Sequence, residues 1–154
     1  MYLGVSTLNI DAKGRLAIPA KYREALAESC ASRLAVTINP SKTNRCLWLY
    51  PENEWLDVAR KLTALPAADR KAQAYRRLIL GHASEQELDA QGRIRISPEL
   101  REFAGLEKRI MLLGQGNKFE IWDVDSMQGS RERWIDDVES PELEGSDQFN
   151  ELSL

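Results

Sequence analysis

The chain carries one segment twice. Asp11-Ala12-Lys13-Gly14-Arg15-Leu16-Ala17-Ile18-Pro19 returns 78 residues later as Asp89-Ala90-Gln91-Gly92-Arg93-Ile94-Arg95-Ile96-Ser97. The match continues with Arg23-Glu24 against Arg101-Glu102, and Leu47-Trp48-Leu49-Tyr50 corresponds to Phe119-Glu120-Ile121-Trp122. Such internal repetition indicates two units of the same design. We therefore divide the chain into a first repeat (1–55), connecting helices (56–82), a second repeat with a closing helix (83–138) and an acidic tail (139–154), which we expect to be flexible.

Each copy of the repeated segment predicts a β-hairpin with arginine on its outer face. Apolar and polar residues alternate on both sides of each turn, which is typical of half-buried strands. Asp11 and Asp89 can accept hydrogen bonds from their own backbone, and Gly14 and Gly92 tolerate positive φ, so these four residues are the expected turn formers. Side chains alternate between the two faces of a strand. Arg15, Arg93 and Arg95 are therefore expected to point outward, and the apolar residues between them to point inward: Leu16, Ile18, Ile94 and Ile96.

Helices and further strands are expected around the two hairpins. A helix follows each hairpin, at about 19–27 and 98–104, and two more, at about 55–65 and 67–80, connect the repeats. Apolar runs at 34–38, 46–50, 110–113 and 119–122 are the remaining strands, and a last helix covers about 125–138. Each repeat therefore reads strand, turn, strand, helix, strand, turn, strand, and the fold class is β-rich α+β.

Composition excludes several classes of protein. With 154 residues, 43% of them hydrophobic and 29% charged, the chain matches one ordinary globular protein. No apolar run approaches the roughly 20 residues of a membrane-spanning helix, and the start of the chain lacks the pattern of a signal peptide. Two cysteines and one histidine give little basis for a disulfide framework, a metal site or histidine-based catalysis. We expect a cytoplasmic protein with no membrane partner.

Charge is distributed unevenly along the chain. The net charge is −3, but residues 134–154 hold seven acidic and no basic side chains. Residues 1–133 are left with 21 basic and 17 acidic groups, or about +4. Binding to nucleic acid is therefore compatible with the composition, provided that it comes from a local patch or from many copies acting together.

Four features of the sequence occur together in one known family. They are Met1 with Gly4, the two Asp-x-x-Gly-Arg hairpins, Gly81-His82-Ala83-Ser84-Glu85, and Gly114-Gln115-Gly116-Asn117-Lys118-Phe119-Glu120-Ile121-Trp122. In this combination the chain resembles the bacterial MraZ family along its whole length, through Leu152-Ser153-Leu154. One departure concerns the N-terminus, because Tyr2-Leu3 stand where many members read Phe-Arg. We therefore assign no basic contact to position 3.

The resemblance implies a fold like that of AbrB and MazE, a swapped-hairpin β-barrel, built here from two tandem pseudo-symmetric repeats plus peripheral helices. It also implies a ring-shaped homo-oligomer, an octamer or a dodecamer, that binds double-stranded DNA at short direct repeats in a promoter. The implied function is sequence-specific transcription regulation at the nucleoid, as a repressor of the chain's own division and cell-wall gene cluster. Neither a cofactor nor catalysis is expected.

The hairpin tips are the candidate DNA-binding residues. The planar guanidinium of Arg15 suits guanine or phosphate, and Lys13 adds a mobile point charge. In the second hairpin Gln91 replaces that lysine, so Arg93 and Arg95 are the weaker candidates. The competing interpretation is a purely structural turn in which each arginine pairs with its own aspartate.

Other notable residues have structural interpretations. Six cations between Arg60 and Ile79 face one acid, Asp69, and we interpret this basic run as a solvated face or a subunit contact. His82 is expected to be structural, and the Gly114-Gln115-Gly116 segment to be a hairpin turn rather than part of a dinucleotide site. The tryptophans at 48, 55, 122 and 134 are expected in the core or in interfaces, and Cys30 and Cys46 as small buried side chains.

Two other functions remain as alternatives. The first is a protein-interaction module, such as an antitoxin-like protein that neutralises a toxin through its acidic C-terminal segment, because related folds serve both roles. The second is a hydrolase that uses Asp11 and Asp89 as paired carboxylates. A neighbouring arginine keeps a carboxylate ionised, which disfavours acid catalysis by either residue.

Overall fold

The computed structural model describes residues 1–143 and 151–152. Part of the predicted acidic tail, at 144–150 and 153–154, lies outside the described residues. The chain forms two compact units, Met1–Val124 and Asp125–Leu154. Both hairpins belong to the first unit.

The order of elements matches the predicted duplication. In the first repeat, β1 (Val5–Asn9), β2 (Arg15–Ala17), α1 (Ala20–Cys30), β3 (Arg33–Ile38) and β4 (Leu47–Pro51) follow one another. The connection contains α2 (Glu52–Thr63), α3 (Arg70–Tyr75) and the π-helical turn η1 (Arg76–Leu80). The second repeat contains β5 (Ser84–Glu87), β6 (Arg93–Arg95), α4 (Pro98–Ala104), β7 (Arg109–Gly114) and β8 (Phe119–Asp123), and α5 (Val124–Glu139) comes last. The predicted strands and helices are confirmed, with ends that differ by a few residues.

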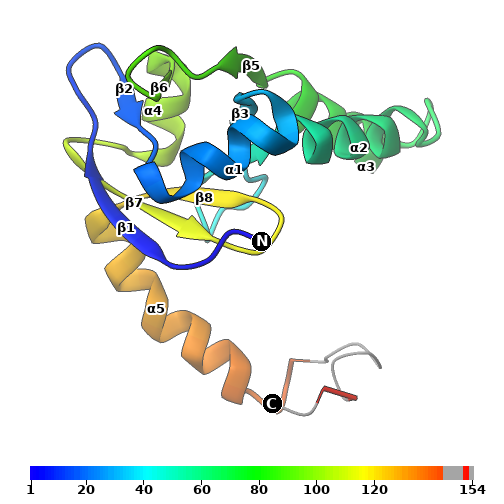
Figure 1. Cartoon of the computed structure of the whole chain (residues 1–154). Helices are drawn as coiled ribbons and strands as arrows, with labels where there is room; N and C mark the ends of the chain where they lie inside the picture. The colour runs from blue at the N-terminus through cyan, green and yellow to red at the C-terminus, as the bar shows by residue number, and fades with distance from the viewer. Residues whose placement is uncertain (144–150, 153–154) are drawn as a thin grey trace. The chain divides into compact units, whose positions relative to one another are not determined.

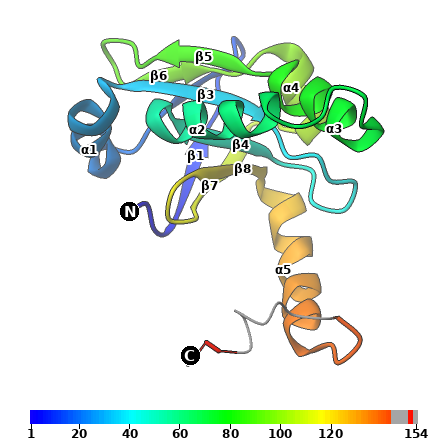
Figure 2. The same cartoon turned by 90° about the vertical axis from the view of Figure 1, so that its right-hand side faces the viewer.

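The two repeats exchange strands. The larger sheet has six antiparallel strands in the order β1-β7-β8-β4-β3-β5, so the first strand of each repeat pairs with the third strand of the other. The fourth strands, β4 and β8, pair at the centre. The second strands, β2 and β6, form a separate two-stranded ribbon. Figures 1 and 2 show β5 and β6 from the second repeat next to β2 and β3 from the first. The repeats are therefore interleaved in one body.

The expected closed barrel is not present in the part of the chain that the structure describes. The six-stranded sheet is open, with β1 and β5 as its edges. The ribbon of β2 and β6 is linked to β1 by an isolated bridge between Ile10 and Leu16 rather than by a continuous ladder. Each predicted hairpin is accordingly a tight turn whose two strands diverge at once, because each strand pairs with the other repeat.

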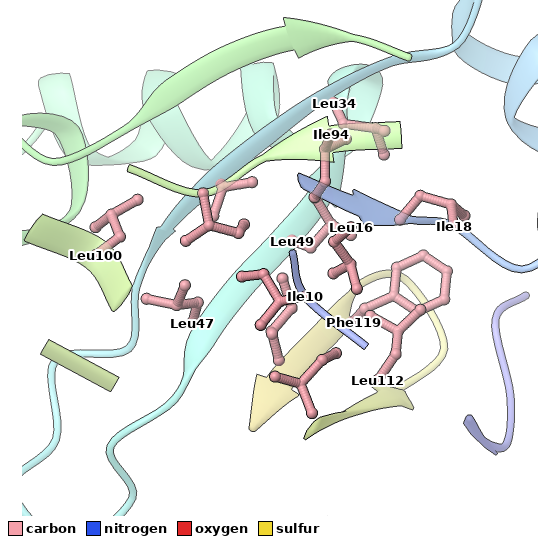
Figure 3. Close-up of a cluster of buried hydrophobic side chains, with 14 of the residues drawn as sticks. Ile10, Leu16, Ile18, Leu34, Leu47, Leu49, Ile94, Leu100, Leu112 and Phe119 are labelled. Atoms are coloured by element: carbon pink, nitrogen blue, oxygen red, sulfur yellow. The ribbon is translucent and has the colours of Figure 1, made fainter. Parts of the chain in front are cut away.

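The main core lies between the ribbon and the inner face of the large sheet. Leu16 in β2 and Ile18 directly after it are fully buried. Ile94 in β6 and Ile96 directly after it occupy the equivalent buried positions in the second repeat. Figure 3 shows Leu16 and Ile94 in the same cluster as Leu49 and Phe119. Burial of side chains of this size contributes about 1.5–3 kcal/mol each, so this face of the ribbon is fixed toward the core. The opposite face of the ribbon is consequently left to solvent.

The connecting helices cover the outer face of β3 and β4. Tyr50 and Trp55 form a second apolar cluster there with Ala35 and Ile79, and Figure 2 shows α2 lying across these strands. Thr37, which is fully buried, donates a hydrogen bond of 2.6 Å to the carbonyl oxygen of Ile79. That carbonyl belongs to η1, where the predicted continuous helix widens into a π-helical turn.

Candidate nucleic-acid interface

The first hairpin is held by the carboxylate of Asp11. It accepts hydrogen bonds from the backbone N–H groups of Lys13 (2.9 Å) and Arg15 (2.8 Å), and Asp11 Oδ2 also accepts from Arg15 Nε at 2.6 Å. The turn is closed by the N–H of Gly14, which donates to the carbonyl of Asp11 at 2.9 Å. Gly14 has φ +80°, a conformation that favours glycine, as the sequence predicted.

The second hairpin repeats this arrangement. Asp89 accepts from the backbone N–H groups of Gln91 (2.9 Å) and Arg93 (2.8 Å) and from Arg93 Nε (2.9 Å). The backbone hydrogen bond from Arg93 is the main reason why the pKa of Asp89 is lowered, and the one from Arg15 lowers the pKa of Asp11 in the same way. Both carboxylates are therefore ionised at neutral pH, which suits a fixed turn and not an acid catalyst.

In each hairpin the Asp–Arg ion pair holds the arginine through its Nε atom. Both the structural interpretation and the functional one are compatible with this geometry. An Nε contact fixes the plane of the guanidinium but uses only one of its five N–H donors. The Arg15 side chain remains 37% exposed, and in the described part of the chain its terminal nitrogens have no hydrogen-bond partner. The aspartate thus orients Arg15 and leaves its outer edge available.

The β2–β6 ladder brings the candidate residues of both repeats onto one face. Arg15 pairs with Arg95, Leu16 with Ile94 and Ala17 with Arg93. Directly opposed residues point to the same side of an antiparallel pair, about 4.5–5.5 Å apart at Cβ. Because Leu16 and Ile94 face the core, the three arginines share the outer face. We call this surface the arginine face: Arg15, Ala17, Arg93 and Arg95 of the ribbon, together with Lys13 at the exposed first tip.

The arginines of this face differ in how they are held. Arg93 has a second partner, because its Nη2 lies 3.3 Å from Oε1 of Gln91, at the position that Lys13 occupies in the first hairpin. Arg95 is exposed, and its backbone N–H and carbonyl are hydrogen-bonded to the amide side chain of Gln86 at 2.8 and 2.6 Å. The second hairpin therefore has more side-chain hydrogen bonds to its own repeat than the first.

The basic run of the connecting helices is largely engaged elsewhere. Arg76 donates to the carbonyls at the end of α2 and in the following loop, at positions 62, 65 and 66. Arg60 and Lys61 both pair with Asp57. Arg70 and Arg77 are exposed. These contacts favour the predicted solvated face over a track for phosphates.

The remaining predictions on single residues concern structural roles. His82 Nδ1 lies within hydrogen-bond distance of the carbonyls of Arg77 and Leu78, and Gln115, in the β7–β8 turn, donates from its backbone to the carbonyl of Lys118. Trp55 and Trp122 are buried, as are Cys46 and, in part, Cys30. Burial raises the pKa of the Cys46 thiol and so disfavours its reactive thiolate form. Gly81 follows η1 in a right-handed conformation, and a Cβ at this position would overlap the carbonyl oxygen of Arg77.

Three residues near the arginine face were given no role from the sequence. Gln86 holds the backbone of Arg95, and Arg23 and Arg101 lie against the tip glycines Gly92 and Gly14. The match of Arg23 with Arg101 in the repeat was the available signal, but it carried no information on which hairpin each one contacts. That depends on the exchange of strands.

Across residues 1–143 and 151–152, no group of three or more His, Cys, Asp or Glu side chains is arranged to hold a metal ion. None of the helices within those residues has the length and apolar character needed to cross a bilayer.

Comparison with known proteins identifies the family of the chain. A family model described as "MraZ protein, putative antitoxin-like" matches residues 1–78 and 79–128. The chain belongs to the MraZ family. It is 46% identical over 154 residues to the transcriptional regulator MraZ of Thioalkalivibrio sulfidiphilus, with both chains covered completely. The protein of the same name from Halorhodospira halophila is 43% identical over 154 residues, also with both chains covered completely. That of Nitrosococcus oceani is 51% identical over 123 residues, 80% of this chain and 81% of that one. MraZ relatives are thus named as transcriptional regulators.

Proposed function

We propose that this MraZ-family chain is a sequence-specific transcriptional regulator that binds double-stranded DNA through the arginine face. The single observation that supports this most is the pairing of Arg15 with Arg95, which gathers the cations of both repeats on one exposed surface. Lys13 and the three arginines bring four cations against the two carboxylates of Asp11 and Asp89. A local excess of positive charge forms although the whole chain has a net charge of −3.

The shape of the ribbon is suited to the major groove. That groove is roughly 12 Å wide and admits a two-stranded β-ribbon. An arginine whose Nε is held by aspartate presents its outer N–H groups as a planar fork, which can contact O6 and N7 of guanine or a phosphate. Arg15 and Lys13 are the proposed principal contacts, with Arg95 beside them and Arg93 as the most restrained.

One ribbon offers too few cations for tight binding alone. We therefore propose a ring-shaped homo-oligomer, an octamer or a dodecamer, whose ribbons engage consecutive direct repeats in a promoter. Linking sites in this way raises affinity through effective concentration. Support for contacts between copies comes from exposed apolar side chains on the connecting helices and their loop: Leu56, Leu65, Tyr75 and Leu78.

The same proposal covers the finer fold and the cellular setting. The strand exchange of β1 and β5 is consistent with an opened form of the swapped-hairpin barrel of AbrB and MazE. The functional units would be the two repeats, 1–55 and 83–138, acting together across the ribbon. The chain would act in the cytoplasm at the nucleoid as a repressor of its own division and cell-wall gene cluster, without catalysis.

Mobility-shift assays on the DNA upstream of the chain's own gene test this proposal, with the direct repeats deleted one at a time. Arg15→Ala should abolish the specific shift while the oligomer and the fold persist. Arg70→Ala is the matched control, because Arg70 is an exposed arginine of the basic run on α3. Equal binding by wild type and Arg15→Ala would refute the assignment. Loss of binding in Arg70→Ala alone would place the site on the connecting helices.

An antitoxin-like interaction is the second candidate, because the family description contains that term and the C-terminal 21 residues are acidic. Deletion of residues 140–154 separates the two functions. Loss of a co-purifying protein with intact DNA binding would show that this segment has its own partner. Loss of DNA binding would instead contradict the restriction of the DNA site to the ribbon.

A further inference from the structure

Two arginines outside the arginine face lie directly beneath the hairpin tips. Arg23 in α1 and Arg101 in α4 occupy equivalent positions in the two repeats. A Cβ on Gly92 would lie 2.6 Å from Cζ and 2.9 Å from Cδ of Arg23, and a Cβ on Gly14 would lie 3.1 Å from Nε of Arg101. Each guanidinium therefore fills the space beside a glycine that has no side chain, and both glycines are buried.

The contacts cross from one repeat to the other. Arg23 belongs to the first repeat but packs on the second hairpin, and Arg101 belongs to the second repeat but packs on the first. Backbone hydrogen bonds follow the same crossing, since Ile18 N–H donates to the carbonyl of Gly92 (2.9 Å) and Ile96 N–H to that of Gly14 (2.7 Å). Each hairpin tip is thus supported by the helix that follows the hairpin of the other repeat.

Packing beside the glycine is the feature that the two arginines share. Arg23 Nε also donates to the carbonyl of Ile18 at 2.7 Å. Arg101 Nε is buried and, among the described residues, has no hydrogen-bond partner. An unpaired buried donor is unfavourable. Arg101 nevertheless lies beside Gly14 in the same way as Arg23 lies beside Gly92. The common role is therefore contact with the tip and not the capping of one carbonyl.

We propose that Arg23 and Arg101 are positioning residues that fix the second and the first DNA-binding hairpin, respectively, each acting on the hairpin of the other repeat. Neither arginine needs to touch DNA. Arg101 sets the position of Lys13 and Arg15 through Gly14, so it couples the helix of the second repeat to the principal contacts. The statement about DNA rests on the proposed function, whereas the crossed support of the tips does not.

Amide hydrogen exchange tests the crossing without DNA. In the full chain, Arg101→Ala should speed exchange at Gly14 and Ile96 by about tenfold, the scale of one lost interaction of this kind, and leave Gly92 and Ile18 nearly unchanged. Arg23→Ala should give the reverse pattern, so the two variants control for one another. Faster exchange at Gly92 and Ile18 in Arg101→Ala, or an equal change at both pairs of amides, would overturn the proposal.

Charge-retaining variants keep the proposal testable if the alanine variants fold poorly. Arg101→Lys and Arg23→Lys preserve the cation but not the planar group beside the glycine. They should show the same crossed pattern of exchange, and Arg101→Lys should lower DNA affinity. Full DNA affinity and wild-type exchange in Arg101→Lys would mean that charge alone matters, and would contradict a positioning role.

A double-mutant cycle on DNA affinity completes the test. Arg101→Ala combined with Arg15→Ala should be less than additive, because both changes remove the same contact with DNA. Arg23→Ala combined with Arg15→Ala should be additive. Additivity for Arg101→Ala with Arg15→Ala, together with non-additivity for Arg23→Ala with Arg15→Ala, would refute the proposal that each arginine supports the hairpin of the other repeat. Wild-type protein that binds no operator DNA, together with a crossed exchange pattern, would reject the proposed function and leave the support of the tips intact.

Discussion

Arg15 and Arg95 are directly opposed on the antiparallel β2–β6 ladder, although each belongs to a different repeat. Like charges placed opposite one another destabilise a strand pair, so this arrangement is unfavourable for the isolated fold. Ion pairs between Asp11 and Arg15 and between Asp89 and Arg93 offset part of the repulsion, but Arg95 has no carboxylate partner among the described residues. An arginine pair whose positive charge is only partly neutralised is expected on a surface that binds an anion, and it is therefore consistent with the proposed function.

The first prediction concerns Arg95. Replacement of Arg95 by alanine should weaken DNA binding and lower the salt slope by about 1, because one phosphate or base contact is lost. It should also leave the free energy of unfolding unchanged or slightly higher, since the repulsion with Arg15 is removed. Fluorescence anisotropy over a salt series and urea denaturation measure the two effects. An unchanged salt slope would show that Arg95 lies outside the interface.

The salt dependence of the wild type reports the number of ribbons engaged. Each neutralised phosphate contributes a slope of roughly −0.9 in log K against log salt, so the four cations of one arginine face give at most about −3.6. A slope clearly steeper than this is expected if several ribbons of an oligomer bind together. Filter binding between low and moderate salt measures it, with the oligomer size determined by light scattering. A slope within the limit for one ribbon would contradict cooperative engagement.

Gln91 offers a gain-of-function test. Its side chain engages Arg93, whereas Lys13 in the first hairpin leaves Arg15 free of such a contact. The variant Gln91→Lys should therefore release Arg93 and add a cation, which raises affinity for DNA and steepens the salt slope. Gln91→Met is the matched control, because it removes the contact without adding charge. An affinity increase in neither variant would indicate that the second hairpin does not approach DNA.

The tip glycines should be less tolerant of alanine than other glycines with positive φ. Gly92→Ala combines an unfavourable φ of +73° with overlap of the Arg23 guanidinium, and Gly14→Ala at φ +80° overlaps the carbonyl of Ile96. Gly105 has φ +62° and nothing within 4 Å, so Gly105→Ala measures the conformational cost alone, about 1–3 kcal/mol. Urea denaturation should place both tip variants below Gly105→Ala in stability. Three equal losses would show that the packing beneath the tips is loose.

Acid should loosen the hairpins. The pKa of Asp11 and that of Asp89 are lowered in the folded chain, chiefly by backbone hydrogen bonds from Arg15 and Arg93. A lowered pKa contributes stability that is present above the ordinary aspartate pKa and is lost as pH falls through the folded value. The two carboxylates should therefore contribute a constant stabilisation between neutral pH and about 5, and this stabilisation should be lost progressively in more acid solution.

The variant Asp11→Asn isolates this contribution. It should be less stable than wild type near neutral pH, and the difference should shrink as the solution is made acid. Denaturation curves at a series of pH values and carboxyl resonances in NMR spectra provide the measurement. A stability difference that stays constant down to the lowest pH would show that Asp11 acts through its size and not its charge.

Much of the fold follows from local pattern in the sequence. The turns at Asp11 and Asp89, the inward isoleucines and the helices are encoded by residues close to one another in the chain. The outward direction of the arginines could be predicted for the same reason. The spacing of the two copies also indicated the duplication.

The pairing of strands could not be predicted from the residues alone. Nothing local distinguishes β2 pairing with β1 from β2 pairing with β6, because register depends on which apolar faces meet in the core. The meeting of Arg15 with Arg95, and the placing of Arg23 under Gly92, are products of that choice. The open sheet and the π-helical turn η1, whose Ile79 carbonyl accepts a hydrogen bond from Thr37, likewise depend on packing between distant segments.

Because the two repeats are joined in one chain, their sequences can differ, which is not possible for the two subunits of a symmetric dimer. In a dimer of identical subunits, any substitution at a tip appears twice. Here the tip has lysine at position 13 and glutamine at position 91, and the supporting arginine is hydrogen-bonded through Nε in only one half. Under the proposed function, the second hairpin can serve mainly as a scaffold while the first supplies the contacts with DNA, and this asymmetry would give the ribbon a direction suited to a sequence that is not a palindrome.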